Sequence, residues 1–220
     1  MPRTSIRSFR YRRPENPTWD LDLEASMHID PTTLNTPHDW SVLFNREAPF
    51  EVEIGFGRAR FLLTAAQRWP EHNWLGIEFV PQGAALCGER AASLDLHNLL
   101  LLHGAAEDYL DNFAPRSVDV FHLYFPDPWP KRRHRKRRFL QPAIAVRLLS
   151  ILKPGGRFHI ASDHLDLFQW MVPIIIDAGF ISAEVPNFYS DEAFVTNFEK
   201  KAERKGVPIN RASFTTPDGH

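Results

Sequence analysis

The sequence FEVEIGFG, residues 50–57, decides the fold. Its first five residues alternate in hydrophobicity, which predicts a β-strand over residues 50–54, and the two glycines after it predict a tight turn. A helix is predicted next, over residues 58–69, because its apolar side chains share one helical face: Phe61, Leu62, Ala65, Ala66 and Trp69. Pro70 ends this helix, so the segment forms one strand-turn-helix unit.

The same unit recurs along the rest of the chain. Four more strands are predicted over residues 74–79, 99–102, 118–125 and 157–162. Three more helices are predicted over residues 81–94, 140–152 and 165–178, the last kinked by its internal proline. Two final strands are predicted over residues 181–185 and 207–214, with a polar segment between them. This alternation predicts an α/β fold with a doubly wound, mostly parallel, seven-stranded sheet of the Rossmann-like kind.

The composition indicates one large domain with an N-terminal extension. Residues 1–48 are rich in Pro, Asn, Asp and Thr without a sustained period, which predicts a basic arm and an irregular lead-in, and residues 49–220 form the domain. The single cysteine, Cys87, excludes an internal disulfide and a cysteine-based zinc site. It fits the reducing cytoplasm, and since no apolar run reaches the length of a membrane span, we expect no membrane association.

The net charge of −1 conceals a strong asymmetry. Residues 1–13 carry five arginines and no acid, and residues 131–138 read KRRHRKRR. These two segments hold 12 of the 26 lysines and arginines, which leaves 14 basic residues against 27 acidic ones elsewhere. A basic run can be a plain solvated segment, but on an otherwise acidic body it favours an anionic partner, most often nucleic acid.

The glycine turn does not match a dinucleotide site. A G-x-G-x-x-G fingerprint requires a third glycine where Arg60 stands, and Glu53 beside the turn would repel a phosphate. Glu78, at the end of the second predicted strand, is placed to accept the hydroxyls of a ribose, or alternatively acts as a helix N-terminal acid. Together with the backbone at Gly55 and Gly57, these acids favour S-adenosylmethionine, whose sulfonium is cationic and which carries no phosphate.

The fourth predicted strand ends in the unusual sequence YFPDPWPK, residues 124–131. Pro126 and Pro128 fix the backbone on both sides of Asp127, so its carboxylate projects from a stiff loop at the carboxyl end of the strand. Such a sequence can also form an ordinary turn, with Trp129 in the core. The basic run follows directly, which places a nucleic-acid handle close to the predicted reaction centre.

Over roughly residues 48–214 the sequence resembles the bacterial tRNA (guanine-N7)-methyltransferases, the TrmB family. The matching strings are EIGFG (53–57), GIE (76–78), FPDPWPK with the basic run (125–138), LKPGG (152–156), SD (162–163) and TNFEKK with the later G and PI (196–209). FPDPWPK followed by basic residues, and T-x-F-E near the end, are specific to this family. EIGFG and LKPGG occur in many class I methyltransferases.

The resemblance implies a class I S-adenosylmethionine-dependent enzyme that methylates N7 of the guanine at position 46, in the variable loop of tRNA. It implies a cytoplasmic monomer or homodimer with no metal and no obligatory protein partner. Asp127 is then the catalytic residue. Cofactor binding is assigned to Glu53, Gly55, Gly57, Glu78, Gly104, Ala105 and Asp127. Substrate binding is assigned to Lys131, Asp163, Thr196, Asn197, Phe198 and Glu199.

Two positions depart from the family pattern. Ala59 follows the glycine turn where the family usually continues with glycine, which predicts a slightly tighter turn. Gly104 replaces the family's Asp or Asn near the adenine, so the backbone N–H of Gly104 or Ala105 is expected to take over that contact.

Methylation of guanine N7 requires few catalytic groups from the protein. Guanine N7 is a lone-pair acceptor with no proton, so no general base is required, and catalysis consists of alignment and of stabilising the positive charge on the purine. Cys87 is expected to be a packing residue, and the histidines show no metal-binding spacing. Two alternatives stay open at this point: an amino-methyltransferase with an N/D-P-P-Y/W type of loop, and an RNA-binding protein that keeps the fold without activity.

Overall fold

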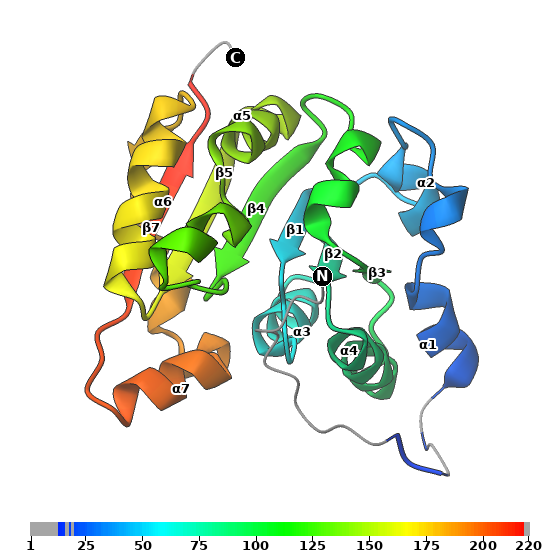
Figure 1. Ribbon diagram of the computed structural model, residues 1–220. Coiled ribbons are helices and arrows are strands. Elements are labelled where there is room, and N and C mark those ends of the chain that lie inside the picture. Colours follow the sequence, from blue (N-terminus) through cyan, green and yellow to red (C-terminus); the bar gives the residue numbers. More distant parts are fainter. Residues whose placement is uncertain (1–12, 16–17, 19, 218–220) are drawn as a thin grey trace.

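The computed structural model describes residues 13–15, 18 and 20–217 (Figure 1). Its strands are β1 (Phe50–Ile54), β2 (Asn73–Glu78), β3 (Leu99–His103), β4 (Val118–Tyr124), β5 (Leu152–Ser162), β6 (Ile181–Ala183) and β7 (Asn210–Thr215). They form one seven-stranded sheet in the order β3-β2-β1-β4-β5-β7-β6. The first five strands pair in parallel, and β7 runs antiparallel to β5 and β6. The prediction of a doubly wound, mostly parallel, seven-stranded sheet is confirmed.

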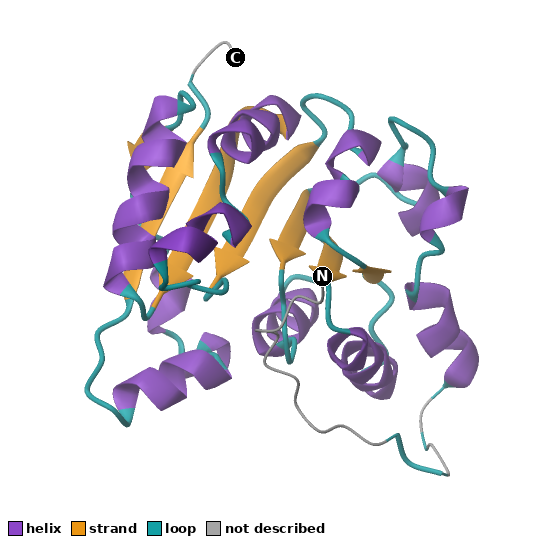
Figure 2. Cartoon of the chain, in the orientation of Figure 1, coloured by secondary structure: helices purple, strands orange, loops and turns teal. Residues whose placement is uncertain are grey.

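Helices cover both faces of this sheet (Figure 2). They are α1 (Leu21–Met27), α2 (Trp40–Phe44), α3 (Arg60–Arg68), α4 (Pro81–Ser93), α5 (Pro142–Ile151), α6 (Leu165–Asp177) and α7 (Asn197–Glu203). The apolar sides of α5 and α6 pack with Val52, Phe121 and Phe158 in one core cluster. On the opposite face, α3 and α4 pack around Trp74 and Leu101. Because both faces are covered, the polar side chains of the central strands are also buried, and Glu51 of β1 and His122 of β4 are hydrogen-bonded to each other at 2.7 Å.

The lead-in to the domain is more ordered than the sequence predicted. Asp20 and Asp39 cap α1 and α2 by accepting backbone N–H groups, a local signal that offsets the short length of these helices. Trp40 is buried and stacks on Phe113 with ring centroids 4.7 Å apart. The expectation of an irregular lead-in therefore needs correction, because part of it belongs to the core. Of the arginines in the predicted basic arm, Arg13 is described, and the other four lie outside the described residues.

Two further segments differ from their predictions. The strand predicted over residues 157–162 begins at Leu152, so that the KPGG sequence belongs to β5. The polar segment before β7 contains α7, which begins with a capping box: Thr196 accepts from the Glu199 N–H, and Glu199 accepts from the Thr196 N–H. The sequence T-x-x-E is the recognised signal for that motif, so this helix could have been predicted from local chemistry.

Candidate active site

A cavity of about 590 Å³ lies at the carboxyl ends of the parallel strands. It is lined by residues that follow β1, β2, β3, β4 and β5, as the doubly wound topology requires. Eight of the predicted site residues line it: Gly55, Gly57, Glu78, Gly104, Ala105, Asp127, Asp163 and Phe198. Other lining residues were not among the predicted site residues, including Phe79, Phe125, Lys136, Arg138, Gln141 and His164.

Glu78, at the end of β2, connects the turn after β1 with the turn after β2 at the edge of the cavity. One carboxylate oxygen accepts the Gly57 N–H at 2.6 Å, and the other accepts the Val80 N–H at 2.7 Å. Burial raises the pKa of Glu78, the two amides oppose that shift, and the nearby charge of Asp127 adds to it. The carboxylate is thus held rigidly, and each of its oxygens has a second lone pair for a ligand hydroxyl.

The glycine turn leaves open space beside the backbone. Gly55 and Gly57 have positive φ angles of 76° and 57°, and a Cβ atom built on either would meet nothing within 4 Å. Ala59 takes the left-handed conformation with a φ of 57° and is the N-cap residue that precedes α3. An alanine therefore adopts, at an energetic cost, a conformation that glycine reaches freely.

Glu53 lies outside the cavity lining. It is buried at the carboxyl end of β1, and its Oε2 has no hydrogen-bond partner among the described residues. Burial first, and then the negative charge of Glu78, raise the pKa of Glu53 to about 8. Its carboxyl group is thus poised to ionise when positive charge arrives nearby.

Tyr109 explains the glycine at position 104. A Cβ atom on Gly104 would lie 2.2 Å from the Tyr109 hydroxyl, which itself donates to the His103 carbonyl. The phenol ring thus fills the space that an Asp or Asn side chain would need. The Gly104 N–H donates to the Glu78 carbonyl at 3.0 Å, so of the two backbone amides expected to face the adenine, that of Ala105 is the better candidate.

The loop that carries Asp127 is strained at both ends. Phe125 and Trp129 have positive φ angles of 52° and 41°, a conformation that costs non-glycine residues about 1–3 kcal/mol each. The Phe125 N–H donates to the Ala161 carbonyl at 2.8 Å, which fixes the start of the loop on β5. Asp127 is half-buried in the cavity wall. The flanking prolines and these two residues together present a carboxylate from a defined position.

The basic run forms a 3₁₀ helix, Arg132–Arg137, beside this loop. Lys131 is exposed and precedes the helix, outside the cavity lining. The guanidinium of Arg137 lies over the Trp129 ring, 5.0 Å from its centroid. Arg138, in contrast, is buried. The run is therefore mostly, but not wholly, a solvated cationic surface at the mouth of the cavity.

The side chains of the T-x-F-E segment, residues 196–199, have two different roles. Thr196 and Glu199 form the capping box, and Glu199 also pairs with Arg211, so both build α7 and lie outside the cavity lining. Phe198 lines the cavity. Asn197 is the first residue of α7, and its side chain is outside the part of the chain that the structure describes.

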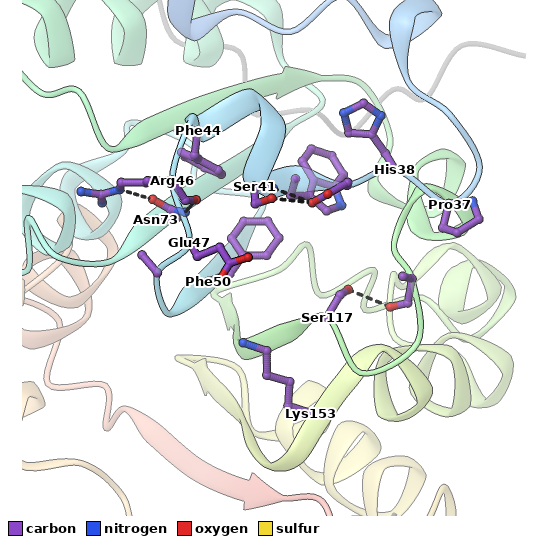
Figure 3. Close-up of a pocket in the computed structure, with 14 residues that line it drawn as sticks. Pro37, His38, Ser41, Phe44, Arg46, Glu47, Phe50, Asn73, Ser117 and Lys153 are labelled. Carbon is purple, nitrogen blue, oxygen red and sulfur yellow. Dashed lines mark hydrogen bonds between the residues drawn. The ribbon is translucent and has the colours of Figure 1, made fainter.

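A second cavity, of about 490 Å³, lies at the opposite end of the sheet, where the strands begin (Figure 3). Figure 3 shows Phe44, Phe50 and Lys153 around it. The Lys153 ammonium pairs with Asp119 at 2.6 Å. This cavity contains none of the predicted site residues, which gather at the carboxyl edge instead.

Within residues 13–15, 18 and 20–217, no three His, Cys, Asp or Glu side chains are grouped to hold a metal ion. Over the same residues no helix is long and apolar enough to span a membrane.

The chain is similar in sequence to known methyltransferases. A family model described as "Putative methyltransferase" matches residues 47–212. A tRNA (guanine-N(7)-)-methyltransferase from Rhodopirellula baltica is 34% identical, over 97% of this chain and 80% of that protein. The enzyme of the same name from Yersinia enterocolitica is 39% identical, over 78% of this chain and 74% of that protein.

Solved structures support the fold. The 16S rRNA methyltransferase KamB superposes with a TM-score of 0.59 at 14% identity, covering 81% of this chain and 93% of that one. A 16S rRNA adenine methyltransferase solved with its cosubstrate S-adenosylmethionine gives a TM-score of 0.57 at 15% identity, covering 82% of this chain and 91% of that one.

Proposed function

The chain belongs to the tRNA (guanine-N7)-methyltransferase family, and we infer from this that it transfers a methyl group from S-adenosylmethionine to N7 of guanine in tRNA. The strongest support is the similarity, over 97% of this chain, to the Rhodopirellula baltica protein of that name. The strained loop of Asp127, which faces a cavity beside a basic helix, provides a place for the reaction.

The residues around the cavity fit the cofactor. Open space beside Gly55 and Gly57 accommodates a ligand that approaches the backbone closely. Glu78 offers fixed acceptors for ribose hydroxyls, and the unpartnered oxygen of Glu53 lies nearby as a latent negative charge. We assign the ribose to Glu78 and the adenine edge to the Ala105 amide. When bound, S-adenosylmethionine supplies an activated methyl group on a cationic sulfur.

Asp127 has two roles in the proposed mechanism. Its carboxylate accepts hydrogen bonds from the N1–H or the amino group of guanine, which aligns N7 with the methyl group. The same negative charge stabilises the positive charge that develops on the purine. Since N7 carries no proton, no residue has to remove one. Asp163 and Phe198 line the same cavity and are proposed to contact the base.

We also propose which guanine is methylated and where and in what form the protein acts. We place the methylated guanine at position 46 of the variable loop and the reaction in the cytoplasm, where tRNA is matured. The protein would act as a monomer or homodimer without an obligatory protein partner. Residues 1–48 would serve as arm and lead-in to the methyltransferase domain of residues 49–220, with Lys131 and the exposed arginines on tRNA phosphates.

One experiment tests this function. Protein is incubated with S-adenosylmethionine labelled in its methyl group and with unmodified tRNA transcript, and the labelled nucleotide is then identified by nuclease digestion and mass spectrometry. We expect 7-methylguanosine at position 46, and no label in a transcript whose guanine 46 is replaced by adenine. Label on an exocyclic amino group would favour the amino-methyltransferase alternative. Binding of tRNA without label transfer would favour a non-catalytic RNA-binding protein.

A further inference from the structure

Arg138 differs from its neighbours in the basic run. Its side chain is 1% exposed, whereas Lys131, Arg132 and Arg133 are exposed. A guanidinium buried to this degree cannot reach the phosphates of a tRNA on the surface. Its positive charge must therefore be paired within the protein, because an isolated buried cation is energetically unfavourable.

Two elements hold this guanidinium. Its Nε donates to the Pro128 carbonyl at 2.9 Å, and its Nη2 donates to the Asp166 carboxylate at the start of α6. The Trp170 ring lies 5.3 Å from the guanidinium carbon, on the same helix as Asp166. The remaining nitrogen, Nη1, is also buried. Arg138 therefore bridges the loop of Asp127 to α6.

This bridge acts where the loop is strained. Pro128 follows Asp127 directly, and Trp129, next in the chain, has a φ of 41°. The Phe125 N–H anchors the start of the loop on β5, and the Arg138 contact anchors its end. Because a strained backbone persists only when its surroundings determine it, the loop needs both anchors to keep Asp127 in place.

We propose that Arg138 is a positioning residue, which holds the strained loop so that the Asp127 carboxylate stays in the catalytic position. The inference rests on the proposed function, and it separates one arginine of the run from those assigned to tRNA. A planar guanidinium can donate to a carbonyl and a carboxylate at once, whereas the lysine ammonium is a single point of charge on a flexible stem.

The test compares Arg138→Gln and Arg138→Lys with the matched control Arg133→Gln. We expect both changes at position 138 to lower kcat by about 10- to 100-fold, as small displacements of catalytic groups do, with KM for tRNA and its salt dependence as in the wild type. Arg133→Gln should instead raise KM for tRNA and reduce the dependence of that KM on salt concentration. Full recovery of kcat in Arg138→Lys, or a change in the salt slope of Arg138→Gln, would overturn the proposal.

A double-mutant cycle links the effect to Asp127. In an Asp127→Asn background, Arg138→Gln should lower kcat little further, because the group that it positions is already inactive. Multiplicative losses would mean that Arg138 acts independently of Asp127 and would contradict the proposal.

Hydrogen exchange does not depend on enzymatic activity, so it tests the anchoring role of Arg138 separately from the proposed function. Hydrogen exchange of a peptide covering residues 122–131 should accelerate in Arg138→Gln and stay unchanged in Arg133→Gln. This holds even if the wild-type protein methylates another atom, and equal exchange in both variants would overturn the anchoring role. If Arg138→Gln fails to fold, Asp166→Asn probes the same bridge from its half-exposed partner and should accelerate exchange in the same peptide. Because Asp166 also pairs with Arg135 at 2.5 Å, Arg135→Gln is the control and should leave that exchange unchanged.

Discussion

The rings of Phe125 and Phe198 lie nearly parallel, at 11°, with their centroids 5.6 Å apart. Phe125 begins the strained loop and Phe198 comes from α7, yet both line the same cavity. The pair gives the cavity an apolar, flat-sided wall next to Asp127. Stacking of a nucleobase on an aromatic side chain contributes about 1–3 kcal/mol to binding.

Replacing Phe198 should therefore weaken substrate recognition. We expect Phe198→Leu to lower kcat/KM for tRNA by roughly tenfold or more, because a branched aliphatic side chain cannot stack on guanine. Phe198→Tyr serves as the control, since it keeps the ring. Steady-state kinetics measure the effect, and thermal unfolding checks that α7 is intact. An unchanged kcat/KM in Phe198→Leu would remove this ring from the site.

A change at Glu78 should affect the cofactor. Glu78→Gln loses a charged acceptor, so affinity for S-adenosylmethionine should fall by about 1–3 kcal/mol. Titration calorimetry measures this directly. Glu71→Gln is the control, because the Glu71 side chain is 64% exposed and lies away from the cavity. Equal affinities in wild type and Glu78→Gln would exclude the ribose role.

Glu53 should make stability depend on pH. Its carboxyl group stays protonated up to about pH 8 in the folded chain, against a normal pKa of 4.5. Between these values the folded state holds one more proton at this site than the unfolded state, so this group's contribution to stability falls as pH rises and levels off above pH 8. Glu53→Gln cannot ionise and should escape that loss.

The comparison is made by thermal unfolding of both proteins without cofactor. The Tm of Glu53→Gln should exceed that of the wild type by a few degrees at about pH 8, and the difference should shrink toward about pH 5. A difference that does not vary with pH would show that Glu53 is ionised in the folded protein.

The exposed arginines should contribute mainly to tRNA capture. Replacing Arg132 and Arg133 together by Gln should raise KM for tRNA and reduce the salt slope by up to about 2, as expected when two phosphate contacts are lost. The measurement is KM at several salt concentrations. If the slope stays at the wild-type value, these side chains do not contact phosphates.

The sequence predicted the sheet and its ligand edge because hydrophobic periodicity is a strong local signal. It also predicted the position of Asp127, since two flanking prolines leave the backbone few conformations. The burial of Arg138 was not predictable, because a buried arginine in a basic run looks like its exposed neighbours until α6 supplies Asp166 and Trp170. The position of the Tyr109 ring beside Gly104 was not predictable either, because it depends on how the short segment between the two residues folds back on itself.

We expect the Asp127 carboxylate to align guanine N7 and to stabilise the positive charge that develops during methyl transfer. The most direct measurement is the single-turnover rate of Asp127→Asn with saturating tRNA and S-adenosylmethionine, together with the affinity for both ligands. The substitution keeps the size and removes the charge, so the rate should fall by about 10²-fold or more while both affinities stay nearly unchanged. A wild-type rate in Asp127→Asn would show that the negative charge of Asp127 does not contribute to methyl transfer.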